Sequence, residues 1–177
     1  MMSLASLPEK LHEQVLLAMQ PGEEPVVVAR PKTAVVNRVS QPYIFFFIFA
    51  IFFDALFIFC GGFWGLPFLL LFVALPFGGI WYTYWQMRNT VYIITERRAL
   101  VVRATGRKGW QTLSWPLTPG LVKERMLRAD GSGDLIFGYE VHKHDDGHTS
   151  VPQGFFNLPE LRRVEQMLMD IIPTPQD

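Results

Sequence analysis

A histidine-rich stretch late in the chain carries the residue types that often bind zinc. The stretch VHKHDDGHTS holds His142, His144 and His148 beside Asp145 and Asp146. His142 and His144, two positions apart in a strand, would share a face, and His148 could return to them across the Asp-Gly turn. The spacing matches no standard zinc site, and such a polar stretch is also typical of a solvated hairpin loop. We therefore favour the loop, keep the three histidines as candidate metal ligands, and expect no cofactor.

Other constellations that carry out catalysis are missing from the sequence. There is no phosphate-binding glycine loop and no nucleophile elbow, and Ser114 and Ser150 have no base at a suitable spacing. Cys60 is the only cysteine, which excludes an internal disulfide, and we interpret it as a small apolar residue. A formal net charge of +0 gives no general attraction to nucleic acid. The sequence therefore predicts a protein that is not an enzyme and has no nucleic-acid partner.

One carboxylate lies within an almost purely apolar run. Asp54 is the only charged residue between Arg38 and Arg88. An Asp costs about 3 kcal/mol at the centre of a membrane helix, and the Phe, Ile and Leu residues around it offset that cost. Asp54 then needs a polar partner. The partner is either the backbone carbonyl of Phe72, which Pro76 leaves without its usual donor, or a group on another membrane protein. A proton pathway is disfavoured because neither apolar segment holds a second titratable residue.

Two long apolar segments predict a helical hairpin in a membrane. At about 1.5 Å per residue, spans of about 43–60 and 67–86 nearly cross a hydrocarbon core of about 30 Å. Lys and Arg flank the outer ends of the hairpin and are absent from its loop, so both termini are expected in the cytoplasm. Aromatic residues mark the cytoplasmic interface, namely Tyr43, Trp81, Tyr82, Tyr84 and Trp85. The sequence thus predicts a multi-pass protein of the bacterial inner (plasma) membrane, with the lipid bilayer as a partner.

The hairpin divides the chain into three predicted parts. Residues 1–40 hold a cytoplasmic helix and a short strand, 41–87 the hairpin, and 88–177 a cytoplasmic domain. In the first part, SLPEKLHEQVLLAM predicts an amphipathic helix with Ser6 and Glu9 at capping spacing. This helix either packs on the domain or lies along the bilayer. The apolar face of the helix consists of Leu4, Leu7, Leu11 and Val15.

After the hairpin the apolar pattern changes to a period of two, which indicates short antiparallel strands. A C-terminal helix follows, with Asn157 and Glu160 at capping spacing and an apolar stripe that includes Leu161, Val164 and Leu168. Six or seven strands closed by one helix predict a curled sheet or half-barrel. The strands are predicted in VVVAR before the hairpin, and in TVYIIT, ALVVRAT, QTLSWPL, LVKERMLR, LIFGYEV and VPQGFF after it.

Three stretches carry a family resemblance. They are YIITERRAL from Tyr92 to Leu100, GSGDLIF from Gly131 to Phe137, and GFFNLPELRRV from Gly154 to Val164. Together with QPGEEPVVVARP before two apolar spans, they resemble the membrane-anchored bacterial PH-like domains over residues 20–172. The resemblance implies an α+β membrane protein: a two-helix transmembrane hairpin and a PH-like antiparallel β split barrel capped by a C-terminal helix. It implies no catalytic residues.

A basic stretch surrounds the first two strands after the hairpin. Each cation held near an anionic leaflet adds about 1 kcal/mol of attraction. The stretch is explained by the charge bias beside a membrane, by binding of anionic lipid headgroups or by docking on an acidic partner. We expect the pair Arg97 and Arg98 to face a leaflet or a partner. The candidate contact residues are Arg88, Arg97, Arg98, Arg103, Arg107 and Lys108.

These features together predict a binding function. The favoured hypothesis is a non-enzymatic accessory subunit or assembly factor of the inner membrane. It would dock on a larger membrane protein complex by protein–protein interaction through its hairpin, including Asp54, and its PH-like domain. The alternative is a membrane-anchored lipid-sensing module that binds anionic headgroups through the basic residues of the first strands.

Overall fold

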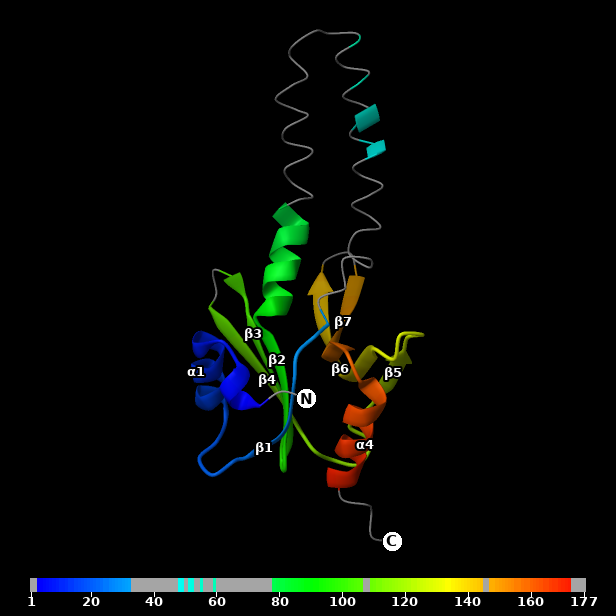
Figure 1. Cartoon of the computed structure of the whole chain (residues 1–177). Helices are drawn as coiled ribbons and strands as arrows, with labels where there is room; N and C mark the ends of the chain where they lie inside the picture. The colour runs from blue at the N-terminus through cyan, green and yellow to red at the C-terminus, as the bar shows by residue number, and fades with distance from the viewer. Residues whose placement is uncertain are drawn as a thin grey trace. The chain divides into compact units, whose positions relative to one another are not determined.

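The computed structural model of the chain divides into two compact units. The larger unit comprises Met1–Lys32 and Arg88–Asp177, and the smaller one comprises Thr33–Met87. The structure describes residues 3–32, 48–49, 51–52, 55, 59, 78–106, 109–144 and 147–172 (Figure 1).

Two antiparallel sheets form the frame of the larger unit. The strand order is β1-β2-β3-β4 in the first sheet and β5-β6-β7 in the second. The antiparallel strands that the period-two pattern predicts are therefore confirmed. The strands are β1 (Pro25–Ala29), β2 (Thr90–Thr95), β3 (Arg98–Ala104), β4 (Trp110–Pro116), β5 (Glu124–Leu127), β6 (Gly133–His144) and β7 (Gly147–Leu158).

The central strand β2 is buried on both faces of its sheet. All of its residues, TVYIIT, are buried. Tyr92 and Ile94 belong to one apolar core, and Val91 and Ile93 belong to a second. Successive side chains of a strand point to opposite faces, so this alternation places a core on each side of the sheet. A strand in this position needs a continuous apolar run, which TVYIIT supplies.

The first core lies between the two sheets and the C-terminal helix α4 (Leu161–Ile171). Phe155 of β7 stacks on Tyr92 of β2, with ring centroids 4.8 Å apart. It also packs edge-on against Phe137 of β6, at 4.9 Å. These ring contacts join the two sheets, and α4 closes the core with the apolar stripe predicted for it. The buried residues of α4 are Leu161, Val164 and Leu168.

The second core lies under the N-terminal helix α1 (Glu9–Ala18), which follows a short 3-10 turn η1 (Leu4–Ser6). Leu7, Leu11 and Val15 are buried in it against residues of β1, β2 and β3. The predicted apolar face is thus confirmed, and of the two positions expected for this helix, packing on the domain is the one observed. The residues of the sheet in this core are Val28, Val91, Ile93, Leu100 and Val102.

Both helices begin without the side-chain caps that their sequences predict. Pro8 is the N-cap of α1 and makes no side-chain hydrogen bond, and the Ser6 hydroxyl donates to the Ser3 carbonyl at 2.7 Å. Glu160 is the N-cap of α4 and also makes none. The predicted capping roles of Ser6 and Asn157 are therefore wrong, because each side chain bonds to a different backbone group.

The predicted transmembrane hairpin is contradicted by the structure. Within the described residues, no helix is both long enough and apolar enough to cross a membrane. Residues 78–88 are helical, but at about 1.5 Å per residue they extend about 16 Å, roughly half of a hydrocarbon core. Most of the two predicted spans, about 43–60 and 67–86, lies outside the described residues. This finding contradicts two predictions, the membrane-protein class and the multi-pass inner-membrane location.

The strands β6 and β7 are longer than their sequence pattern predicts. The pattern limits them to LIFGYEV and VPQGFF with a polar loop between, whereas the structure extends β6 to His144 and starts β7 at Gly147. Because the added residues are polar or mixed, they show no period-two signal. The outer half of this hairpin, residues 138–153, is referred to below as the arm.

Candidate functional site

Arg98, one of the predicted contact residues, is held inside the larger unit. Its guanidinium binds the Glu23 carboxylate through two nitrogens, with Nε–Oε1 at 2.9 Å and Nη2–Oε2 at 2.7 Å. The two side chains are 18% and 3% exposed. Nη2 also donates to the Ala18 carbonyl at 3.1 Å, at the end of α1. The expectation that Arg98 faces a leaflet or a partner is therefore wrong, whereas Arg97 is exposed.

The turn between β2 and β3 supports this ion pair. The Thr95 hydroxyl donates to Glu23 Oε1 at 2.7 Å and accepts from the backbone N–H of Arg98 at 3.2 Å. The hydrogen bonds from Arg98, together with those from the Gln20 backbone and Thr95, lower the pKa of Glu23 to about 2, against the opposing effect of burial. The stretch TERR thus joins α1 to the sheet, which is a structural role.

The low pKa of Glu23 predicts a specific loss of stability in acid. The pKa of Glu23 in the folded protein, about 2, lies below the ordinary value of 4.5 for a glutamate. The stabilisation is therefore complete above pH 4.5 and is lost as the pH falls towards 2. In urea unfolding across this window, the wild type should lose more stability than Glu23→Gln. Equal losses in both proteins would contradict the assignment.

The other basic candidates do not gather with Arg97. Arg103 lies at the far end of β3 and donates to Gln111 Oε1 from Nε at 3.0 Å and from Nη2 at 2.8 Å. At about 3.3 Å per residue, Arg97 and Arg103 are roughly 20 Å apart along the strand. Arg88 precedes β2, and its carbonyl accepts a hydrogen bond from Arg30. The remaining two candidates, Arg107 and Lys108, lie outside the described residues.

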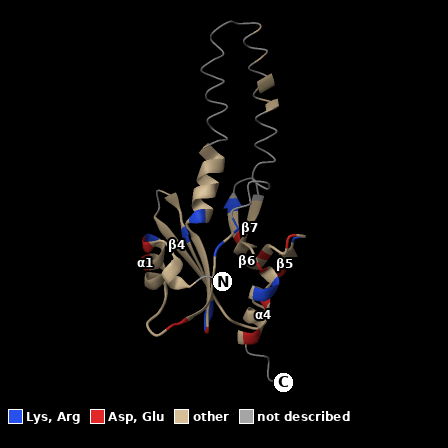
Figure 2. Cartoon of the chain, viewed as in Figure 1, with Lys and Arg blue, Asp and Glu red and all other residues tan. Residues whose placement is uncertain are grey.

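Lys and Arg are accordingly spread over several elements in the part of the chain that is described (Figure 2). Headgroup binding by the whole set needs one continuous surface, and the described members of the set are distributed between two ends of one sheet. Lipid binding stays a prediction that this geometry does not strengthen.

A largely buried polar network that the sequence analysis missed joins the β5-β6-β7 sheet to the segment after β1. Asp134, whose side chain is 3% exposed, accepts from Arg128 Nη2 at 2.7 Å and from the Asn157 backbone N–H at 2.7 Å. Asn157 Oδ1 accepts from Arg128 Nη1 at 2.9 Å. The Asn157 amide nitrogen donates to the Lys32 carbonyl at 2.8 Å. Each of these atoms bonds to another group of the larger unit, so the role of the network is to stabilise the fold.

Asn157 adopts an uncommon backbone conformation within this network. Its φ is 60°, a left-handed value that Asn tolerates better than most residues. This conformation lets its backbone N–H and side chain reach Asp134 and Lys32. The only sequence signal for this role is the residue type, because the spacing of Asn157 and Glu160 also fits a helix cap.

The histidines are not brought together as metal ligands. His142 pairs with Thr149, and His148 pairs with Lys143, so His142 and His148 lie on opposite faces of the arm. His142 is 3.7 Å from Glu140. No group of three His, Cys, Asp or Glu residues suited to a metal occurs among the described residues. The predicted partners Asp145 and Asp146 lie outside them, as do Asp54 and Cys60.

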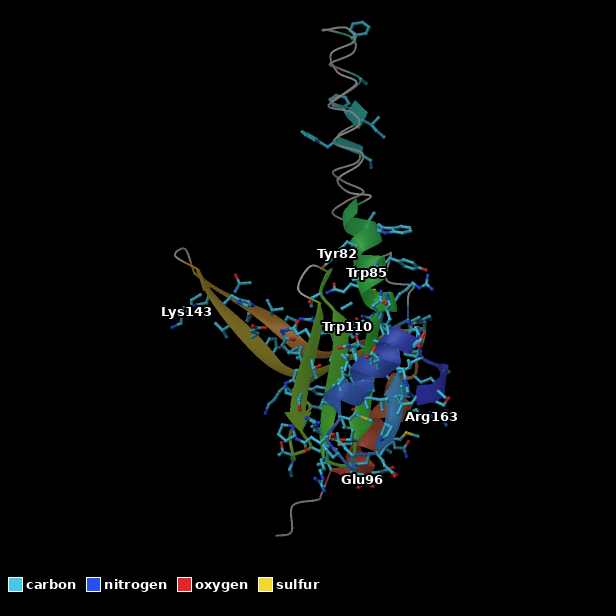
Figure 3. All side chains as sticks on the ribbon, turned by 90° about the vertical axis from the view of Figure 1, so that its left-hand side faces the viewer. Tyr82, Trp85, Glu96, Trp110, Lys143 and Arg163 are labelled. Carbon is cyan, nitrogen blue, oxygen red and sulfur yellow. The ribbon has the colours of Figure 1, made fainter. Side chains whose placement is uncertain are left out.

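Four aromatic side chains are exposed on the helical residues 78–88. Trp81 is 72% exposed and Tyr82 47%, and Tyr84 and Trp85 are each 38% exposed. The rings of Tyr82 and Trp85 stack with centroids 6.1 Å apart (Figure 3). Positions three and four apart are neighbours on a helix surface, which brings Trp85 next to both Trp81 and Tyr82, and Tyr84 next to Trp81. We refer to these four residues as the aromatic surface.

The arm is a second exposed feature, in the larger unit. It extends away from the cores, with Lys143 near its end (Figure 3). Tyr139, Val141 and Val151 are 49%, 58% and 38% exposed. The described side chains of 139–143 and 148–152 are all exposed, so both faces of the arm are open.

Comparison with known proteins assigns no function to these surfaces. The chain matches no family model, no curated protein and no solved structure. The resemblance to bacterial PH-like domains therefore stays a prediction.

Proposed function

We propose that this protein is a non-enzymatic accessory or assembly protein that docks on a larger protein complex through the aromatic surface. The proposal rests on the exposure of four aromatic residues within the helical residues 78–88, namely Trp81, Tyr82, Tyr84 and Trp85. Aromatic side chains dominate the energetics of protein interfaces, and a helix face that presents several of them is a typical binding element. Contiguous exposed apolar surface also favours association over solvation.

The chemistry of the aromatic surface describes the partner. Indole and phenol rings each combine a flat apolar body with one polar group, Nε1–H in Trp and O–H in Tyr. The partner should offer apolar pockets for the rings, with hydrogen-bond acceptors at the rim. A flat, fully charged surface would leave the rings in water and bind weakly.

The rest of the described structure supports a binding role over catalysis. The buried residues Asp134 and Asn157 and the partly buried pair Glu23 and Arg98 bond to other side chains of the unit or to its backbone, and these bonds hold elements together. We further propose that the larger unit is a PH-like domain. The four-stranded and three-stranded antiparallel sheets with a C-terminal helix support this assignment.

Substitution of the aromatic surface tests the proposed function. Proteins that co-purify with the tagged full chain at a stoichiometric ratio are identified by mass spectrometry, purified, and titrated against it by calorimetry. Trp81→Ala should raise the dissociation constant of the complex by about thirtyfold, because an aromatic residue at the centre of an interface contributes about 2 kcal/mol or more to binding. Trp81→Ala with Tyr82→Ala should raise it further.

Leu17 provides the matched control. It is 72% exposed, the same fraction as Trp81, and lies on α1. Leu17→Ala should leave the dissociation constant unchanged. If Trp81→Ala and Leu17→Ala bind the partner equally well, the aromatic surface is not the docking site. The same conclusion follows if the double variant recovers as much partner as the wild type.

A further inference from the structure

Along the arm, one edge of β6 has no pairing strand among the residues that the structure describes. β5 pairs with β6 only between Gly133 and Ile136. From Gly138 onwards, β6 pairs with β7 alone in the described part of the chain. An unpaired edge offers a row of N–H and C=O groups to another strand, and a hairpin of two strands is only marginally stable in water.

We propose that the β6 edge of the arm pairs with the same edge of a second copy of this chain, which makes the protein a twofold dimer. This goes beyond docking through the aromatic surface, which lies on a different element. The four strands would form one antiparallel sheet in the order β7-β6-β6-β7. The occupant is argued from proline placement, residue register and charge.

Pro152 selects the β6 edge over the β7 edge. It lies opposite Tyr139 and lacks a backbone N–H. Proline is accommodated in a sheet where its nitrogen points away from the neighbouring strand, so Pro152 interrupts the outer edge of β7. The same geometry makes Tyr139 and Pro152 a pair without hydrogen bonds. Tyr139, Val141 and Lys143 then direct their N–H and C=O groups to the open edge of β6.

The open edge is complementary to itself. A twofold axis perpendicular to the sheet, midway between Val141 and its copy, places these two residues opposite each other. Both lie on the same face, because antiparallel partners share a face. Tyr139 then lies opposite Lys143 of the second copy, where the cation can contact the ring. Glu140 lies opposite His142 of the second copy, a pairing of the kind already present within one chain at 3.7 Å. Every cross-strand pair in this register is compatible.

The dimer also covers exposed apolar surface without forming a filament. Val141, 58% exposed, would meet its copy at the axis, and Tyr139, 49% exposed, would lie two residues from it on the same face. The outer edges of the new sheet would be the two β7 strands, each interrupted by Pro152. A twofold contact that leaves only interrupted edges closes on itself.

Disulfide cross-linking of the full chain tests the register. In a Cys60→Ser background, Val141→Cys places two thiols across the axis, with Cα atoms about 5.5 Å apart, within reach of a disulfide. Val151→Cys is the matched control, since it is exposed and nearly level with Val141 but lies on β7. Its two copies would be about 14 Å apart, at about 4.8 Å per strand.

Mild oxidation should give at least tenfold more covalent dimer from Val141→Cys than from Val151→Cys. In sedimentation equilibrium, Val141→Lys should raise the dimer dissociation constant at least tenfold, because like charges would meet at the axis, while Val151→Lys should not. Equal cross-linking at both positions, or no selective effect of Val141→Lys on a sample with native circular dichroism, would overturn the proposal.

Discussion

Arg98→Met should lower the free energy of unfolding by about 3 to 5 kcal/mol. Methionine keeps the apolar stem of the side chain and removes the guanidinium. The Glu23 carboxylate, 3% exposed, would then retain only its bonds from Thr95 and the Gln20 backbone. Leaving one member of a buried ion pair without its partner costs about this much. Urea unfolding monitored by tryptophan fluorescence measures the change.

An exposed ion pair in the same unit serves as the control for Arg98→Met. Arg163 and Glu160 are 3.3 Å apart, with side chains 59% and 55% exposed. Arg163→Met should change stability by less than about 1 kcal/mol, because water solvates both charges. A second substitution, Glu23→Leu, should restore part of the stability of Arg98→Met. Similar losses for Arg98→Met and Arg163→Met would show that the buried pair does not join α1 to the sheet.

Gly154→Ala should destabilise the protein by about 3 kcal/mol or prevent folding. A Cβ atom at this position would overlap the backbone carbonyl oxygen of Leu135 and crowd Ile136. Both contacts are backbone atoms of the paired strand β6, so no side chain can turn aside to relieve them. Forcing extra atoms into a close-packed site costs about 1 to 3 kcal/mol when the surroundings can adjust, and they adjust least here.

Gly138 offers a control at the base of the same hairpin. A Cβ atom there meets nothing within 4 Å. Gly138→Ala should therefore be neutral or stabilise the strand by about 0.5 kcal/mol, since alanine loses less conformational entropy than glycine on folding. Thermal unfolding of the two variants separates them. Equal midpoints would mean that β6 and β7 do not approach each other as closely at Gly154 as the structure indicates.

The sequence pattern alone predicts the elements whose side chains repeat with the period of a strand or helix. TVYIIT, ALVVRAT and the stripe of α4 are examples, since burial on one or both faces requires apolar residues at fixed spacing. Leu11 and Val15 likewise follow from helical spacing. The pattern fails for the outer part of the arm, because residues exposed on both faces carry no periodic signal.

The residue types in YIITERRAL predict a partner-binding cation, and those in VHKHDDGHTS predict metal ligands. The long-range contacts and the strand register of the structure form neither site. In the first, Arg98 reads as an exposed cation but binds Glu23, which is 75 residues away in sequence. In the second, the strand register places His142 and His148 on opposite faces, and a shift of one residue would have joined them. Neither a long-range partner nor a register is encoded in local spacing.

By itself, then, the sequence determines where those strands and helices lie that bury at least one face, and which of their faces are apolar, because those properties depend on near neighbours. Only the tertiary structure decides which polar groups bond to other groups of the protein and are therefore not free to bind a partner. Asn157 bonds to Lys32 across 125 residues, and Glu23 reaches Thr95 across 72. Such contacts form only after the apolar cores have brought the sheets and α1 together, since each ion or amide loses water on burial and is stable there only with its partner in place.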